Sequence, residues 1–198
     1  DDALAMVAAD MATKLPTGRA PFVFHVSGRS GAAMLEPLRT AGAPTAAIHP
    51  AMTFSGDPHA EAQRMAGAYF AMTGSTPAAT GQAQRIVKLL GGIAVEISED
   101  RRSLYHAALC HASNHLVTLI TGAANTLRDA GVDDPSGLLA PLVRAALENS
   151  LDLGFSGLSG PLLRGDVHVV CLPALGVVDA LQAGTIEALP AGAANPQA

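Results

Sequence analysis

The chain has 198 residues, 49% of them hydrophobic and 4% aromatic, and a formal net charge of −5 at pH 7. This length allows one large domain or two small ones, and the hydrophobic fraction suffices for a packed core. The acidic balance and the scattered Lys and Arg exclude a basic nucleic-acid-binding surface, so we expect no nucleic-acid partner. Cys110 and Cys171 have no CxxC spacing, which indicates a reduced, cytoplasmic protein.

The first half of the sequence alternates between helical and strand patterns, which is typical of a parallel or mixed sheet in an α/β fold. Pro37 is expected to kink or restart the second helix. Ser75 or Thr76 is expected to cap the helix that Pro77 begins. We predict helices over 3–15, 32–41, 59–66 and 77–90, and strands over 22–26, 45–49, 69–73 and 93–97.

After residue 97 the pattern becomes helical. We predict one long helix over 99–130, a second from Ser136 to Leu153, and a further helix between Val167 and Gln182. The Ala/Gly/Pro-rich tail, residues 190–198, is expected to be disordered. The fold class is therefore α/β followed by all-α. The α/β part has few strands for a doubly wound sheet, so we expect the natural protein to begin upstream and this chain to be a fragment.

Residues 103–127 contain no Lys, Arg, Asp or Glu, yet include His106, His111, Asn114 and His115. An uncharged helix of this length must be buried along most of its length, and its imidazoles and amides need partners. Its many polar residues, and the absence of basic or aromatic flanks, argue against a membrane span. We therefore expect a central core helix that carries part of the chemistry.

At about 100° per residue, His106 and Ser113 share one face of such a helix, Asn114 lies at its flank, and His111 and His115 lie nearly opposite. His106 with Ser113 or Asn114 could line a cleft against the α/β part. His111 and His115 are spaced to chelate a metal. No third ligand motif accompanies them, so packing or a contact between subunits is the favoured interpretation, and we predict no metal site.

Two predicted strands end in segments that could meet a ligand, because ligands of open α/β sheets bind beyond the carboxyl ends of strands. The first strand ends in the turn Ser27–Gly31. Ser27 and the amides from Gly28 onward could face a ligand there, and the alternative is a simple turn with Ser30 as N-cap. The second strand ends at His49, which could accept a proton from a substrate hydroxyl. The alternative for His49 is a hydrogen bond with the loop backbone.

Four segments together resemble one family. They are HPAMTFSGD (49–57), EDRRSLYHAALCHASNHL (99–116), PLVRAALEN (141–149) and SGPLLRGD (159–166). They are similar to bacterial oxidoreductases that join a Rossmann-like NAD(P) domain to a helical domain of unknown function. That family belongs to the 6-phosphogluconate-dehydrogenase-like superfamily, near pyrroline-5-carboxylate reductases and prephenate dehydrogenases.

The resemblance implies that residues 1–97 are the C-terminal part of a dinucleotide-binding domain and residues 98–189 a helical substrate and dimerisation domain. It makes His49 and Ser27 the leading catalytic candidates, with His106 and Asn114 on the first long helix beside them. Ser27, Gly28 and Pro50 would contact NAD or NADP. No GxGxxG motif follows a strand in this sequence, so the main phosphate-binding loop is absent from this chain.

We therefore expect a cytoplasmic NAD(P)-dependent oxidoreductase that acts on a small hydroxy acid or imine. It would form a homodimer through its helical domain and have no membrane partner. The alternative is a non-catalytic binding or dimerisation module. The catalytic hypothesis depends on one expectation, namely that His49 faces the uncharged helix across a gap wide enough for a small molecule.

Overall fold

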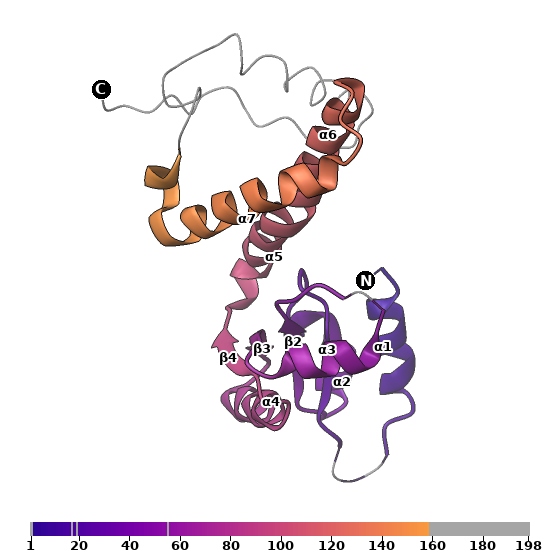
Figure 1. Cartoon of the computed structure of the whole chain (residues 1–198). Coiled ribbons are helices and arrows are strands. Elements are labelled where there is room, and N and C mark those ends of the chain that lie inside the picture. The colour runs from indigo at the N-terminus through magenta and orange to yellow at the C-terminus, as the bar shows by residue number, and fades with distance from the viewer. Residues whose placement is uncertain (1, 17, 19, 55, 159–198) are drawn as a thin grey trace, which may run out of the picture. The chain divides into compact units, whose positions relative to one another are not determined.

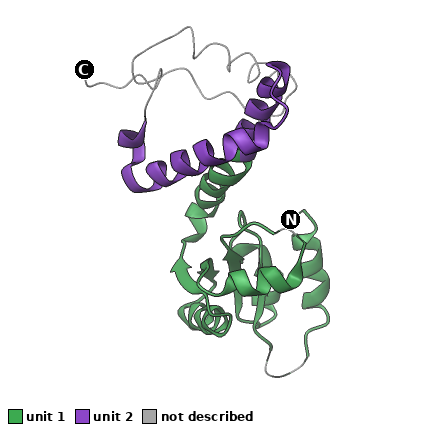
Figure 2. Cartoon of the chain, in the orientation of Figure 1, with its two compact units in different colours: residues 1–116 green, residues 117–198 purple. Residues whose placement is uncertain are grey.

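The structure, a computed structural model, describes residues 2–16, 18, 20–54 and 56–158 (Figure 1). The chain divides into two compact units, residues 1–116 and 117–198 (Figure 2). The predicted boundaries after residues 97 and 189 were drawn from changes in sequence pattern, and they stay predictions. The helix expected between Val167 and Gln182 and the tail after residue 189 lie outside the described residues.

The first unit is an α/β structure built on one four-stranded sheet of order β1-β2-β3-β4. Strands β1 and β2 are parallel, β2 and β3 are antiparallel, and β3 and β4 are parallel. The sheet is thus mixed, and the predicted fold class of α/β followed by helices is confirmed. The strands are β1 (Val23–His25), β2 (Thr45–Pro50), β3 (Tyr69–Gly74) and β4 (Ile93–Glu96).

The helices of the first unit connect these strands as the alternating pattern predicts. Pro37 does restart the second helix, because a short 3-10 segment, η1 (Ala32–Leu35), precedes α2 with Pro37 in its first turn. The helices are α1 (Leu4–Ala12), α2 (Glu36–Thr40), α3 (Pro58–Met65) and α4 (Pro77–Leu89), followed after β4 by η2 (Glu99–Arg101) and α5 (Arg102–Cys110).

Helix α4 shows how local sequence and packing agree. Thr76 caps the helix, since its side chain accepts a hydrogen bond from the Ala79 amide, and Pro77 stands at the first position. The helix ends at Leu89, and Gly91 just beyond it has a φ of +73° that suits glycine. Between these ends, Ala79, Ala83 and Val87 are fully buried at helical spacing.

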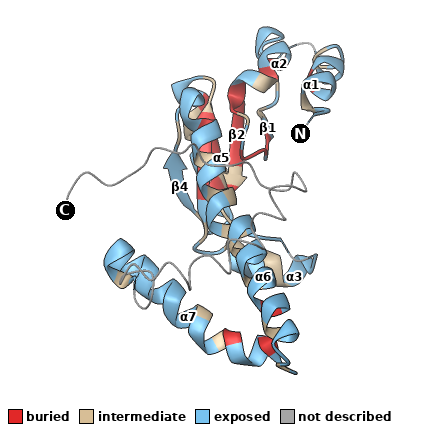
Figure 3. Ribbon diagram, turned by 90° about the horizontal axis from the view of Figure 1, so that it is seen from above, coloured by how far each residue is buried: buried red, intermediate tan, exposed pale blue. Residues whose placement is uncertain are grey.

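The main core forms where α4 covers β2 and β3. Figure 3 shows β2 as a largely buried strand. Burying each large apolar side chain of this cluster contributes roughly 1.5–3 kcal/mol relative to exposure. A second cluster, of Ala8, Leu35, Leu38 and Ala43, joins α1 to α2. The main cluster consists of Ala46, Ile48, Phe70, Met72, Ala83 and Val87.

The helix predicted over residues 99–130 is continuous over residues 99–129, but it is not α-helical throughout. The 3-10 segment η2 precedes α5, and a π-helical segment, η3 (His111–His115), separates α5 from α6 (Leu116–Asp129). A π turn bonds residue i to i+5 and holds one more residue than an α turn. Helix faces that are assigned at 100° per residue are therefore wrong for the residues after Cys110.

The second unit contains most of α6 and the long helix α7 (Pro135–Leu153), which ends in the 3-10 turn η4 (Gly154–Gly157). Asp134 caps α7 by accepting a hydrogen bond from the Gly137 amide. Among the described residues, none of the helices combines the length and apolarity that a bilayer span requires.

The uncharged helix is not buried as expected. Leu104, Val117 and Leu119 are 63%, 65% and 61% exposed, and the imidazoles of His111 and His115 are exposed as well. The expectation assumed that a charge-free sequence must be covered within its own chain, and the described residues do not cover this one.

Candidate functional site

Residues from three separate parts of the first unit meet above Gly28, in the turn that follows β1. A Cβ atom built on Gly28 would lie 2.6 Å from Nδ1 of His106 and 2.9 Å from Nε2 of His49. The two imidazoles therefore converge on one point at the carboxyl ends of β1 and β2. His49 thus lies at the same sheet edge as the turn of residues 27–31.

His49 is the penultimate residue of β2 and pairs in register with Ala71 of β3. Its Nδ1 lies 2.9 Å from the Tyr105 hydroxyl, and its ring meets the His106 ring edge to face at 6.3 Å between centroids. The ring thus contacts α5 directly. We expected a gap wide enough for a small molecule between His49 and the helix. This expectation is wrong at Tyr105, because a hydrogen bond joins Tyr105 to His49.

Burial lowers the pKa of His49 to about 4, and the nearby Arg102 and His106 act in the same direction. Desolvation disfavours the imidazolium form, and neighbouring positive charge disfavours it further. His49 is therefore neutral at pH 7, with one nitrogen as donor and the other as acceptor. A neutral imidazole is the form that can accept a proton.

His106 lies in α5, and its two nitrogens have different surroundings. Its Nε2 is 3.5 Å from Sγ of Cys110. Its Nδ1 is buried and has no hydrogen-bond partner among the described residues. An unsatisfied buried polar atom costs about 1–3 kcal/mol, so the Nδ1 above Gly28 is a destabilising feature of this packing.

The turn after β1 is held by a buried histidine that sequence analysis did not single out. The Ser27 amide donates to Nδ1 of His25 at 3.1 Å, so Nε2 of that ring carries the proton and donates to the Gly31 carbonyl at 2.8 Å. Burial lowers the pKa of His25, which keeps the ring neutral and suited to both bonds. His25 therefore fixes the turn that carries Gly28.

Ser27 is buried, and its hydroxyl accepts a hydrogen bond from the Ser30 amide. Its carbonyl oxygen accepts one from Arg102. Ser30 does not act as an N-cap, because Gly31 occupies the cap position of η1 without a side-chain bond. Instead, the Glu99 carboxylate accepts from the Ala33 amide at 3.4 Å, so it binds a backbone donor at the start of η1.

Asn114 and Pro50 stand apart from this cluster. Asn114 is exposed in the π segment and accepts a hydrogen bond from Ser113. It follows His106 by eight residues, about 12 Å along a helix. Pro50 is buried in the sheet opposite Phe70, which leaves little of its surface for a ligand. The roles predicted for both residues stay predictions.

Two residues that sequence analysis missed complete the cluster, Arg102 and Tyr105. Arg102 is 1% exposed and donates to three backbone carbonyls. One sequence feature could have indicated its burial, namely that Arg102 is the last charged residue before the uncharged residues 103–127. Tyr105 gave no signal beyond its position beside His106.

His111 and His115 do lie together, as their spacing predicted. Their Nδ1 atoms are 2.8 Å apart and both rings are exposed. Within the part of the chain that the structure describes, no three His, Cys, Asp or Glu side chains are grouped closely enough to hold a metal ion.

Two hollows among the described residues lie away from this cluster. One, of about 330 Å³, lies beside η1 and α2 at the ends of β3 and β4. Three carboxylates, those of Glu36, Glu96 and Glu99, line it together with a single guanidinium, that of Arg39. Such an excess of negative charge disfavours the phosphates of a dinucleotide.

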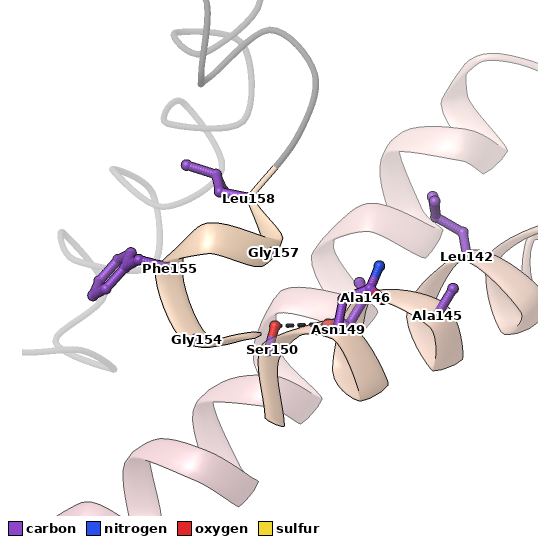
Figure 4. Close-up of a pocket in the computed structure, with 9 residues that line it drawn as sticks. All are labelled: Leu142, Ala145, Ala146, Asn149, Ser150, Gly154, Phe155, Gly157 and Leu158. Carbon is purple, nitrogen blue, oxygen red and sulfur yellow. Dashed lines mark hydrogen bonds between the residues drawn. The ribbon is translucent and has the colours of Figure 1, made fainter. Parts of the chain in front are cut away.

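The other hollow, of about 560 Å³, is formed by α7 and η4 in the second unit (Figure 4). Its lining contains no titratable side chain, and the Ser150 hydroxyl within it donates to the Ala146 carbonyl. We therefore do not assign catalysis to it. Its lining residues are Leu142, Ala145, Ala146, Asn149, Ser150, Gly154, Phe155, Gly157 and Leu158.

Comparison with protein families gives one match. Residues 68–173 match the family described as Domain of unknown function (DUF2520). The matched segment begins at the end of the loop before β3, so it includes Arg102, Tyr105 and His106 but not Gly28 or His49. A search of proteins with curated functions found none that matches this chain.

Solved structures share the fold. Protein TM1727 of Thermotoga maritima is 24% identical with a TM-score of 0.65, and the alignment covers 82% of this chain and 62% of that one. A candidate NADP oxidoreductase of Bacteroides fragilis is 18% identical with a TM-score of 0.68, over 90% and 66% of the two chains. Pyrroline carboxylate reductase of Plasmodium falciparum, solved with NADP bound, is 12% identical with a TM-score of 0.55, over 92% and 68%. This chain thus spans about two thirds of the length of the structures that it matches.

Proposed function

Because the chain belongs to the DUF2520 family and has a Rossmann-like, NADP-oxidoreductase-like fold, we propose that it forms part of an NAD(P)-dependent oxidoreductase. Its substrate would be a small hydroxy acid or imine. The observation that carries the proposal is the convergence of His49 Nε2 and His106 Nδ1 above Gly28. The position of this point agrees with the rule that ligands of α/β sheets bind beyond the carboxyl ends of strands.

The residues present fit the nicotinamide end of such a cofactor. Gly28 lets the two imidazoles approach the turn closely, since a Cβ there would clash with both, and His106 Nδ1 is buried without a partner among the described residues. Ser27 and Gly28 would hold this end of the cofactor, with Pro50 as the third predicted contact. When bound, the nicotinamide supplies or accepts a hydride. The residues of this chain would handle the accompanying proton.

His49 is suited to the role of general base. Its low pKa keeps the ring neutral at pH 7, so Nε2 can accept the proton of a substrate hydroxyl as the alcohol is oxidised. His106 Nδ1 would hydrogen-bond the same substrate and orient it. In the reverse direction the imidazolium form of His49 would return this proton to the substrate oxygen, and its low pKa means that little of this form is present at pH 7.

The proposal is tested first by cofactor binding. The complete natural protein is titrated with NADH and with NADPH while the nicotinamide fluorescence is followed, and binding of at least one is expected. Saturable binding of neither would overturn the proposal and favour a non-catalytic binding or dimerisation module.

Turnover is then measured on a panel of small hydroxy acids and imines. His49→Gln is expected to lower kcat by about 10²–10⁴-fold, the usual contribution of a positioned acid or base. His59→Gln, on the exposed face of α3, is the matched control and should leave kcat unchanged. Equal turnover by both variants would remove His49 from the mechanism.

A further inference from the structure

Arg102 is the largest side chain that the first unit buries completely, at 1% exposed. Its Nε donates to the Ser30 carbonyl, one terminal nitrogen to the Ala71 carbonyl and the other to the Ser27 carbonyl. These contacts join the start of α5 to β3 and to the turn after β1, across 31 to 75 residues of sequence.

The partners of this guanidinium are unusual for a buried charge. Among the described residues its hydrogen bonds go to carbonyl oxygens, and no carboxylate forms a salt bridge with it. Burying a charge without a paired carboxylate is costly. Three well-separated carbonyl acceptors match the planar fork of an arginine better than the single ammonium of a lysine.

Tyr105 extends this network to His49. The Arg102 guanidinium lies 5.5 Å from the centre of the Tyr105 ring, one helical turn away, which is within the range of a cation–π contact. The Tyr105 hydroxyl is 2.9 Å from Nδ1 of His49, and the two rings meet at 83°. A continuous set of contacts thus runs from the turn through Arg102 and Tyr105 to the imidazole.

The bond to Tyr105 occupies one nitrogen of His49 and leaves the other, Nε2, facing Gly28. We propose that Tyr105 and Arg102 are positioning residues of the site. Tyr105 fixes the orientation and the tautomer of the His49 imidazole, while Arg102 fixes Tyr105 and the turn beneath Nε2. The contacts themselves do not depend on the proposed function. The inference rests on that function only where it concerns the chemistry that His49 performs.

The electrostatic environment supports these roles. The charged and titratable groups that face His49 are Arg102, Tyr105 and His106, all on α5. Burial raises the pKa of Tyr105, so its hydroxyl keeps its proton at neutral pH. A neutral imidazole has one donor and one acceptor nitrogen. The base role of His49 requires the tautomer whose Nδ1–H donates to the Tyr105 oxygen, which leaves Nε2 as the acceptor.

Two tyrosines in the sequence provide a matched pair of variants. Tyr105→Phe removes the hydroxyl and keeps the ring against Arg102, whereas Tyr69→Phe changes a residue of β3 that is 56% exposed. The tautomer and the pKa of His49 are measured by nitrogen-15 NMR of the complete protein, with the signal assigned by its loss in His49→Gln. This measurement needs neither cofactor nor substrate.

We expect the wild type to show one His49 tautomer. Tyr105→Phe should show both tautomers and lower kcat roughly threefold to tenfold with little change in KM, as the loss of one hydrogen bond predicts. Tyr69→Phe should match the wild type. Arg102→Met should raise the pKa of His49, and Arg102→Lys, which keeps the charge, should restore the low value in part.

The inference is overturned if Tyr105→Phe leaves both the tautomer and kcat of the wild type intact. Because Arg102→Met removes three buried hydrogen bonds and could fail to fold, the decision rests on the Tyr105→Phe comparison. If the protein bound no nicotinamide cofactor yet Tyr105→Phe changed the tautomer, the proposed function would fail and the positioning role would stand.

Discussion

At the scale of single residues, the absence of a side chain at Gly28 allows the two imidazoles of the candidate site to approach the turn. Both imidazole nitrogens occupy the space that a methyl group at this position would need. Such close approach of backbone to other groups is a common reason for glycine in a turn. The identity of the residue in the turn and the placement of two distant histidines are therefore linked.

Gly28→Ala is expected to displace both rings. The added methyl group would meet His106 Nδ1 at 2.6 Å and His49 Nε2 at 2.9 Å, and overpacking of this kind typically costs 1–3 kcal/mol. The free energy of unfolding measured in urea should fall by about that amount, and turnover should fall with it. Gly81→Ala, in α4 with open space around it, is the control and should be neutral or stabilising by up to about 1 kcal/mol. A stability of Gly28→Ala equal to that of the control would contradict the packing described here.

At the scale of single elements, the end of β3 and the start of α4 show how a local ambiguity is resolved. The sequence offered Ser75 or Thr76 as the cap of α4. In the structure Thr76 accepts from the Ala79 amide, while the Ser75 hydroxyl accepts from the Thr45 amide at the start of β2. Each hydroxyl thus satisfies a backbone donor, one within the helix and one across the sheet.

Thr76→Ala is therefore expected to destabilise the protein by about 1 kcal/mol, the usual cost of losing an N-cap side chain. Thermal or urea unfolding measures the effect. Thr76→Ser keeps the acceptor oxygen and should restore most of the stability, and Thr53→Ala, in an exposed loop, should change little. Equal stabilities for Thr76→Ala and Thr76→Ser would show that the hydroxyl does not cap the helix.

The π segment His111–His115 is the element that sequence periodicity missed. Its residues have ordinary helical backbone angles at both borders, and no proline or glycine marks it. The i to i+5 pattern is visible only when the hydrogen bonds are known. The spacing of His111 and His115 still predicted their proximity, because residues four apart remain neighbours on a helix.

At the scale of the whole molecule, α6 is charge-free between Leu116 and Leu127, yet both Val117 and Leu119 are exposed. Residues two apart on a helix point in directions about 200° apart, so α6 presents apolar side chains on more than one side. Exposed apolar side chains on a charge-free helix are one signal of association. This agrees with the homodimer expected through the helical region, which stays a prediction.

We expect the complete protein to sediment as a dimer. Leu119→Lys would place a charge in the interface and should shift the protein toward the monomer at micromolar concentrations. Leu89→Lys, at the end of α4 where the side chain is 86% exposed, is the control and should remain dimeric. Analytical ultracentrifugation distinguishes these outcomes, and a monomeric wild type would refute the prediction.

The sequence by itself determined the α/β-then-helical fold class, most helices and strands of the first unit, and the candidacy of Ser27, Gly28, His49 and His106. These follow from local signals, namely apolar periodicity, turn residues and the rule on strand ends. The tertiary structure alone decided that Arg102 and Tyr105 join the cluster and that Asn114 lies apart from it. The physical reason is that Arg102 bonds to carbonyls 31 to 75 residues away, and backbone carbonyls leave no mark in a sequence because every residue has one.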